Sequence, residues 1–383
     1  MQVRTLTWAP GTGWSPDLSS FGEADGASTL VLAFADPSIA DTPHPLHQLS
    51  ATFGRSHLLA CSTAGQILDD SVSEAEIVVA VAQFERTGLA LAWETVSDHA
   101  GSRSVGSALG AAMSGKDHLE ALSAVFVVSD GLVVNGSDLV NGLVQSLTPG
   151  VHISGGLAAD GPDFGRTWVF VEGEVREGVV AAIGLHGDCV AFGHGSVGGW
   201  DSFGPERRVT RSDANVLHEL DGRPALALYK DYLGERAAEL PSSALLFPLS
   251  IRSPGGDVSL VRTVLAVDDE QQTMTFAGDV PEGWTARLMR TTVDRLVDGA
   301  HAAGVMSMIE VPQTDSQLAL AVSCVGRRLV MGTRTDEEVE ATLEALGPDT
   351  TLVGFYSYGE IAPSDGFCSL HNQTMTVTTI RER

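Results

Sequence analysis

The order of its elements constrains this chain more than any single motif does. The sequence predicts a strand, a helix, a second strand, a glycine turn and then two or more strands. This order occurs around residues 29–94, 124–185 and 317–380, and Gly65-Gln66-Ile67 and Gly359-Glu360-Ile361 hold equivalent places in it. We therefore expect the two halves of the chain to be distant duplicates that face each other, which superposing them would test.

The fold class follows from how helices and strands alternate. Helices alternate with single strands, but predicted antiparallel pairs interrupt the alternation, for example at 77–83 with 87–94. This predicts an α+β (mixed α/β) fold of two domains, each with a mixed, largely antiparallel sheet packed by helices. The expected divisions are an N-terminal extension that is surface-packed or partly disordered, a first domain and a second domain: 1–26, 27–219 and 220–383.

Two helices are predicted from their spacing in the second half. Residues 284–300 place Trp284, Leu288 and Leu296 on one apolar face. Residues 335–346 begin with Thr335 and Glu338 at the spacing of a capping box, in which the two side chains bond each other's backbone N–H groups.

Charge and cysteine usage exclude several classes of partner. The chain has 23 Lys+Arg against 49 Asp+Glu, a net charge of −26, whereas nucleic acid and anionic membranes attract basic surfaces. The charge serves solubility or, alternatively, attracts a cationic ligand or basic partner. The first residues lack a continuous apolar stretch, no run is long enough to span a bilayer, and the four cysteines show no metal or disulfide spacing. We expect a cytoplasmic protein with no nucleic-acid or membrane partner.

Glycines and hydrogen-bonding side chains gather where the predicted buried strands end. Such clusters suit a small-molecule site, because glycine lets the backbone approach a ligand and polar groups fix its orientation. The alternative for each glycine is an ordinary tight turn. The candidate ligand-binding residues are Cys61, Ser62, Thr63, Gly65, Asp130, Gly155, Gly156, Cys324, Arg327, Tyr356, Tyr358, Gly359, Glu360, His371 and Asn372.

Arg327 and Glu360 carry the most specific chemistry among these candidates. An arginine after a strand can hold a carboxylate through two parallel hydrogen bonds, and a glutamate can hold an ammonium group. Together they would suit a zwitterion such as an amino acid. The alternatives are a surface ion pair for Arg327, capping of a neighbouring amide for Glu360 and a hydrogen-bonded core position for His371. Tyr356 and Tyr358 alternate, so at most one of them is expected to line a pocket.

An enzyme is the competing interpretation. Cys61 or Cys324 with His371 would make a nucleophile and a base, as in a cysteine-dependent hydrolase or transferase. No signature of a cysteine hydrolase, serine hydrolase, nucleotide-binding loop or zinc protease is present, and buried cysteines usually serve as small apolar side chains. We therefore favour a binding protein over an enzyme, and we expect no cofactor and no metal site.

Seven segments in order resemble the FIST family. They are CSTAGQI from Cys61, SGGLAADG from Ser154, ELDGRPALALYKDYLG from Glu219, LLFPL from Leu245, GDVPEG from Gly278, SCVGRR from Ser323, and GFYSYGEI from Gly354 followed by LHNQTMTVT. Their order is similar to a FIST N-terminal domain followed by a FIST C-terminal domain, from about residue 27 onward. The resemblance implies a sensory module that binds small molecules such as amino acids.

Three functions follow as hypotheses. The first is a stand-alone cytoplasmic sensor that binds a small polar ligand between its halves and signals through a separate protein partner. The second is the cysteine-dependent enzyme described above. The third is a scaffold with no ligand. Loss of turnover in Cys61→Ser and Cys324→Ser would favour the second, and the absence of any saturable ligand would favour the third.

Overall fold

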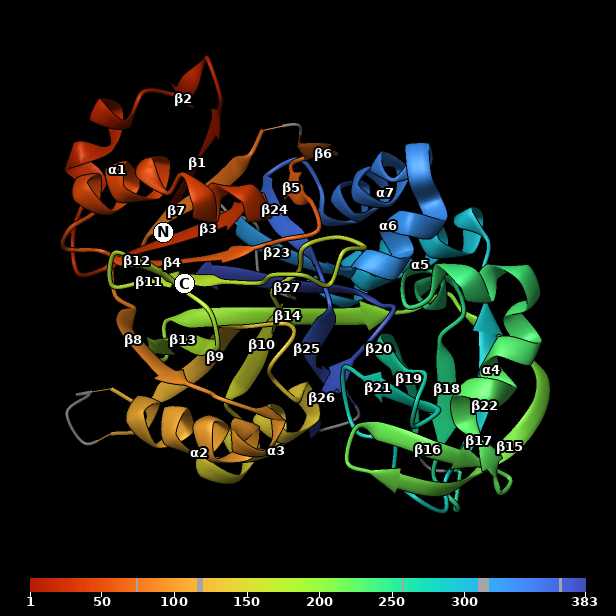
Figure 1. The fold of residues 1–383 in the computed structure, drawn as a ribbon. Helices are drawn as coiled ribbons and strands as arrows, with labels where there is room; N and C mark the ends of the chain where they lie inside the picture. Colours follow the sequence, from red (N-terminus) through yellow and green to blue (C-terminus); the bar gives the residue numbers. More distant parts are fainter. Residues whose placement is uncertain (74, 116–119, 257, 309–316, 365–366) are drawn as a thin grey trace.

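Three units with the same strand order surround a common core, and a fourth sheet is inserted into the third unit (Figure 1). In each unit a central strand pairs in parallel with the strand that follows its helix, and antiparallel with the last strand of the unit. The computed structural model describes residues 1–73, 75–115, 120–256, 258–308, 317–364 and 367–383.

The units contain corresponding elements. The first comprises β1 (Gln2–Ala9), β2 (Gly13–Ser15), β3 (Thr29–Ala35), α1 (His44–Thr52), β4 (His57–Ser62), β5 (Gln66–Leu68), β6 (Ser71–Ser73) and β7 (Ile77–Gln83). The second comprises β8 (Gly88–Thr95), α2 (Ser102–Met113), β9 (Leu122–Ser129), α3 (Gly136–Ser146), β10 (His152–Leu157), β11 (Val169–Val171), β12 (Glu174–Arg176) and β13 (Val179–His186). The third comprises β14 (Val190–Val197), α5 (Val293–Met306), β23 (Gln317–Cys324), α6 (Val325–Met331), α7 (Asp336–Leu346), β24 (Thr350–Ser357), β25 (Gly359–Ser364), β26 (Phe367–His371) and β27 (Met375–Glu382).

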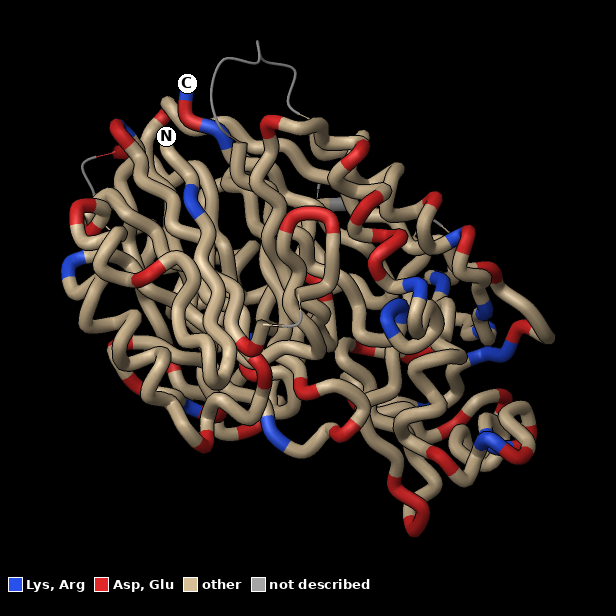
Figure 2. The backbone as a smooth tube through the Cα atoms, turned by 90° about the horizontal axis from the view of Figure 1, so that it is seen from above, with Lys and Arg blue, Asp and Glu red and all other residues tan. Residues whose placement is uncertain are grey.

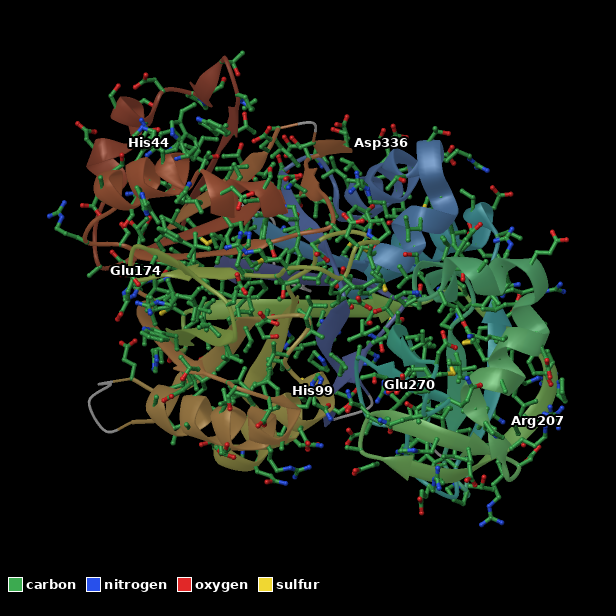
Figure 3. The ribbon with its side chains drawn as sticks, in the orientation of Figure 1. His44, His99, Glu174, Arg207, Glu270 and Asp336 are labelled. Carbon is green, nitrogen blue, oxygen red and sulfur yellow. The ribbon has the colours of Figure 1, made fainter. Side chains whose placement is uncertain are left out.

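Each unit gives a hairpin to the sheet of another unit. The hairpin β5–β6 pairs with β24 of the third unit, β25–β26 pairs with β10 of the second, and β11–β12 pairs with β4 of the first. Side chains strengthen this exchange. Asp336 at the start of α7, labelled in Figure 3, accepts a hydrogen bond from the Val72 N–H of β6 at 2.8 Å. The three units are therefore interlocked rather than merely packed side by side.

The inserted sheet lies between β14 and α5 and forms a separate lobe in Figure 1. It has its own core of buried side chains, including Val209, Leu226 and Phe276. Its elements are β15 (Asp201–Asp213), β16 (Val216–Leu220), β17 (Arg223–Pro224), α4 (Ala225–Leu233), β18 (Leu249–Arg252), β19 (Ser259–Arg262), β20 (Val264–Asp268), β21 (Thr273–Phe276) and β22 (Thr285–Arg290).

The central core forms where inward-facing residues of the three sheets meet. Alternate residues of β3, β9 and β23 point into it, as the period of two in a strand requires, and Leu32, Phe126 and Leu320 occupy corresponding positions. Phe34 of the first unit stacks on Phe355 of the third, with ring centroids 4.8 Å apart. Burial of apolar surface between units thus accompanies the exchange of hairpins.

The expected α+β fold with mixed, helix-packed sheets is confirmed. The repeated order predicted at 29–94, 124–185 and 317–380 corresponds to the three units, so the repeat is threefold where we expected two facing halves. Residues 1–26 contribute β1, which pairs with β7 from Gln2 to Trp8. The expected boundary at 219/220 falls within β16 of the inserted sheet. Among the described residues no helix combines the length and the apolar character required to cross a membrane.

Two helix predictions need correction. The helix expected at 284–300 begins only at Val293, because Thr285–Arg290 forms β22 between β15 and β18. The backbone hydrogen bonds that this segment forms with β15 and β18 stabilise a strand there, although its apolar residues have the spacing of a helix. The capping box is also wrong. The Thr335 hydroxyl donates to the carbonyl of Gly332, and Glu338 turns into the core.

Removing the aromatic contact between units should destabilise the whole molecule. Phe355→Ala deletes a fully buried ring, and we expect the free energy of unfolding to fall by about 3–5 kcal/mol. Urea denaturation followed by circular dichroism measures this change. Val144→Ala, at a side chain 40% exposed, serves as the control and should change stability by less than about 0.5 kcal/mol. Equal effects of the two substitutions would show that the Phe34–Phe355 contact does not hold the units together.

Candidate functional site

The ends of β4, β10 and β24 meet at one place. Each of the three segments donates a backbone N–H to another, which closes a ring: Ala64 to Tyr356 (2.8 Å), Tyr358 to Leu157 (3.2 Å) and Ala159 to Ser62 (3.1 Å). The structure therefore brings together the glycine and tyrosine segments that sequence analysis selected separately. Parallel strands present their carboxyl ends at one edge of a sheet, which is where open α/β sheets bind ligands.

A cavity of about 260 Å³ opens beside this ring. All three units line it, since Gly65 belongs to the first, Asp160 to the second and Arg328 to the third. Of the candidate ligand-binding residues, Thr63 and Gly65 lie in its wall. Among the described residues, the lining consists of Asp36, Pro37, Thr63, Ala64, Gly65, Gln66, Ser73, Ala75, Glu76, Asp160, Gly161 and Arg328.

Arg328 supplies the positive charge of the cavity. Its Nη1 donates to the carbonyl of Ala64, and its guanidinium carbon lies 5.6 Å from the centre of the Tyr356 ring. In the described part of the chain it forms no salt bridge, so its charge is available to an anion. Gly65 has φ +130°, and a Cβ at that position would overlap the guanidinium. The positive φ thus favours glycine there, and any larger residue would also have to displace the Arg328 side chain.

The described lining also contains three carboxylates, whose negative charge opposes that of Arg328. They belong to Asp36, Glu76 and Asp160. Oδ1 of Asp36 accepts from the Ser38 N–H at 2.9 Å and the Ser38 hydroxyl at 2.6 Å. Asp160 accepts from the Tyr358 hydroxyl and from two backbone N–H groups. Burial and the neighbouring Asp36 carboxylate raise the pKa of Glu76 above its usual value. Asp and Glu are also spread around the whole outline of the backbone in Figure 2.

Arg327 lies away from the cavity in a buried ion pair. Its side chain and that of Glu338 are both 0% exposed, with Arg327 Nη2 2.7 Å from Glu338 Oε2. Glu338 Oε1 also accepts from the hydroxyls of Tyr356 at 2.7 Å and Ser323 at 3.1 Å. Arg327 in turn donates to the carbonyls of Gly198 and Leu296. Arg327 therefore forms an ion pair, but the pair is buried rather than on the surface as the alternative expected.

Glu360 is buried on the other side of the ring. It accepts from the Ser357 hydroxyl at 2.8 Å, the Thr374 N–H at 3.1 Å and the Thr374 hydroxyl at 2.9 Å. Burial raises its pKa to about 8, against a usual 4.5. Neither Glu360 nor Arg327 lines the cavity, so the zwitterion that we assigned to them would have to bind to other residues.

The remaining candidates form the frame around the ring. The Tyr358 ring stacks on Phe164 at 4.8 Å, and Gly359 of β25 pairs with Leu157. Asn372 donates to the Tyr358 carbonyl at 3.1 Å, and His371 Nε2 lies 3.0 Å from the Ser369 hydroxyl. Among the others, Asp130 accepts from the N–H groups of residues 132, 133 and 178, while Gly155 and Gly156 lie in β10 between β9 and β25.

The two candidate nucleophiles, Cys61 and Cys324, are buried in the core among apolar side chains. Cys61 and Cys324 are each 0% exposed, and burial raises the pKa of both thiols, which disfavours the reactive thiolate. Neither lines the cavity. This geometry favours packing over catalysis for both cysteines.

Sequence reasoning missed the four charged residues of the described cavity lining. Arg328 and Asp160 could have been selected from the sequence, because they belong to the segments SCVGRR and SGGLAADG that carry the family resemblance. Asp36 and Glu76 belong to no such segment. They are brought together by the antiparallel pairing of β3 with β7, in which the Asp36 N–H donates to the Glu76 carbonyl at 2.8 Å.

Comparison with known proteins gives a family, one protein of similar sequence and one solved structure with a low similarity score. The model of the FIST N domain matches residues 29–223, and that of the FIST C domain matches residues 225–363. An uncharacterised protein of Methanocaldococcus jannaschii, MJ1623, is 25% identical over 272 residues, which are 63% of this chain and 50% of the relative. The chain thus spans half the length of that protein. The crystal structure of cyanuric acid hydrolase from A. caulinodans aligns with all of this chain and 98% of its own, at 11% identity and a TM-score of 0.40.

Breaking the buried ion pair should be costly. Glu338→Gln leaves the charge of Arg327 buried without its carboxylate, and we expect the free energy of unfolding to fall by about 3–5 kcal/mol. Glu344→Gln, at an exposed position of the same helix, is the matched control. Urea denaturation of both variants measures the difference. If Glu338→Gln is as stable as Glu344→Gln, the pair does not hold α6 against α7.

Glu360 should make stability depend on pH. Between the usual pKa of 4.5 and the folded value of about 8, the native state binds more protons than the unfolded state. The free energy of unfolding should therefore fall as pH rises through this window. Glu360→Gln keeps a neutral side chain and should lack this decline. Urea denaturation of both proteins across the window tests it, and parallel pH profiles would contradict a raised pKa.

Proposed function

Because the chain belongs to the FIST family, whose domains are associated with sensory signal transduction, we propose that it is a sensor for a small polar molecule. The ligand binds in the cavity beside the ring of strand ends, and a separate protein partner reads the bound state. One observation carries this proposal: a half-buried arginine without a carboxylate partner among the described residues faces a cavity lined by all three units. A ligand there would bind to the three units at once.

The charges of the cavity support an amino acid as the ligand. The guanidinium of Arg328 suits a carboxylate, which it can hold through two parallel hydrogen bonds. Asp36 and Glu76 suit an ammonium group, and binding it would relieve the repulsion between them. At about 260 Å³ the cavity lies just below the roughly 300–1,000 Å³ of sites for drug-sized ligands, so a molecule as small as an amino acid fits its scale.

A chain of contacts leads from the cavity to the inserted sheet. Arg328 lies over the Tyr356 ring, Tyr356 donates to Glu338, and Glu338 holds Arg327. The carbonyls bound by Arg327 belong to Gly198, just before β15, and Leu296, in the helix after β22. A ligand that draws Arg328 away from Tyr356 would thus act on both connections of the inserted sheet. We propose that the partner reads the resulting change in that sheet.

The proposed location is the cytoplasm. All four cysteines are free thiols in the structure, as is usual in a reducing compartment. Localisation of a fluorescent fusion in the source cell would test this assignment.

Ligand binding should depend on Arg328. The first measurement is a thermal-shift screen of the purified protein against single amino acids, because a ligand at one hundred times its Kd adds about 2.7 kcal/mol to native stability. Arg328→Met removes the charge that holds the carboxylate, and we expect titration calorimetry to show affinity about tenfold or more weaker. Arg252→Met, on an exposed residue of β18, should bind normally. Equal affinity in both variants would place the ligand elsewhere.

A further inference from the structure

We infer that the cavity selects an amino acid with a second positive charge, such as L-lysine or L-arginine, and that Glu76 together with Asp36 determines this specificity. The inference rests on the proposed function and adds the chemical class of the ligand. It follows from which carboxylates of the cavity already accept hydrogen bonds from the protein and which still have a free oxygen.

The cavity contains more negative charge than a simple zwitterion can compensate. Its described lining holds three carboxylates, those of Asp36, Glu76 and Asp160, against one cation, Arg328, which is an excess of two carboxylates. A zwitterion brings one ammonium and one carboxylate and leaves that excess unchanged. A basic amino acid brings a further cation and reduces it. In a partly enclosed site an uncompensated carboxylate is unfavourable, so the additional cation is stabilising.

Both carboxylate oxygens of Asp160 already accept hydrogen bonds from other groups of the protein. Its Oδ1 accepts from the Tyr358 hydroxyl, and its Oδ2 accepts from the N–H groups of Gly165 and Arg166, each at 2.7 Å. These bonds fix the loop that follows β10. Asp160 therefore shapes the wall, and the remaining two carboxylates are left for a ligand.

Asp36 and Glu76 retain free acceptor atoms. The bonds of Asp36 to Ser38 use only Oδ1, so Oδ2 has no hydrogen bond among the described residues. No described residue donates to the Glu76 carboxylate, which is half-buried in the cavity wall. The two carboxylates are close enough for Asp36 to help raise the pKa of Glu76. An organic ammonium group between them would donate hydrogen bonds to both.

The side chains of this site favour an organic cation over a metal ion. Within the described parts of the chain, no group of three or more His, Cys, Asp or Glu side chains is arranged to hold a metal. A lysine ammonium or an arginine guanidinium needs only the two acceptors present. The carboxylate of the same ligand would then pair with Arg328 on the other side of the cavity.

A pair of ligands that differ in one group tests the inference. L-Lysine and L-norleucine share the backbone and the chain of carbons, but norleucine lacks the terminal ammonium. We expect titration calorimetry of the full chain to show lysine binding about tenfold or more tighter than norleucine. Glu76→Gln should weaken lysine about tenfold and norleucine by less, so that the preference for lysine decreases. Glu94→Gln, on an exposed position of β8, changes the net charge equally and should preserve the preference.

The pH dependence of binding gives a second readout. The cation binds best to ionised Glu76, so affinity for lysine should fall as pH decreases through the raised pKa of that carboxyl. Asp36, Asp160 and Arg328 are the other charged groups among the described residues of the wall. Glu76→Gln should lose most of this dependence, and norleucine should show less of it than lysine.

Each outcome decides one question. If neutral or acidic amino acids bind the wild-type protein as tightly as lysine, the selectivity inference is overturned while the proposed function stands. If no amino acid binds, the proposed function fails and the inference fails with it. Should Glu76→Gln not fold, the comparison of lysine with norleucine on the wild-type protein still decides the question. Addition of Mg²⁺ should not displace lysine, and competition between them would assign the acidic pair to a metal.

Discussion

The backbone hydrogen bonds that join Ala64, Ala159 and Tyr358 to their neighbouring units are the constraint on which this structure depends. Each bond exists only because a hairpin from one unit completes the sheet of another. No unit can therefore complete its own sheet alone, and the ends of three strands are held at one point. The cavity is a consequence of that meeting, since its lining requires residues from all three units. A site built on interlocked strands is more rigid than one built on a single loop.

Adjacent arginines serve opposite purposes. Arg327 forms a buried ion pair with Glu338 and donates hydrogen bonds to carbonyl groups at both connections of the inserted sheet. Arg328, in contrast, lines the cavity. A buried ion pair adds little net stability against apolar residues of the same volume, but breaking it is costly. Here the pair links the buried Tyr356 ring, over which the Arg328 guanidinium lies, to both connections of the inserted sheet. Structure and the proposed signal then depend on the same few side chains.

Sequence reasoning recovered the repeated order of elements and the segments that meet at the ring, because strand periodicity and glycine turns are local properties. It could not assign the hairpin exchange, which depends on pairing between residues as distant as Gln66 and Phe355. It predicted a helix where β22 forms, since Trp284 and Leu288 fit a helical face while their strand partners lie elsewhere in the chain. It selected Arg327 rather than Arg328, because spacing alone does not show which of two neighbouring arginines meets a buried Glu338.

Hydrogen–deuterium exchange of the full chain, with and without a saturating amino acid, tests the central claim most directly. A ligand held where the units meet should slow exchange in the three ring segments 62–65, 157–160 and 356–360 together, because it would contact all three units. The account predicts this joint protection, accompanied by a change in the inserted sheet at 201–290. Protection confined to the inserted sheet, or to a single unit, would contradict a ligand site at the junction.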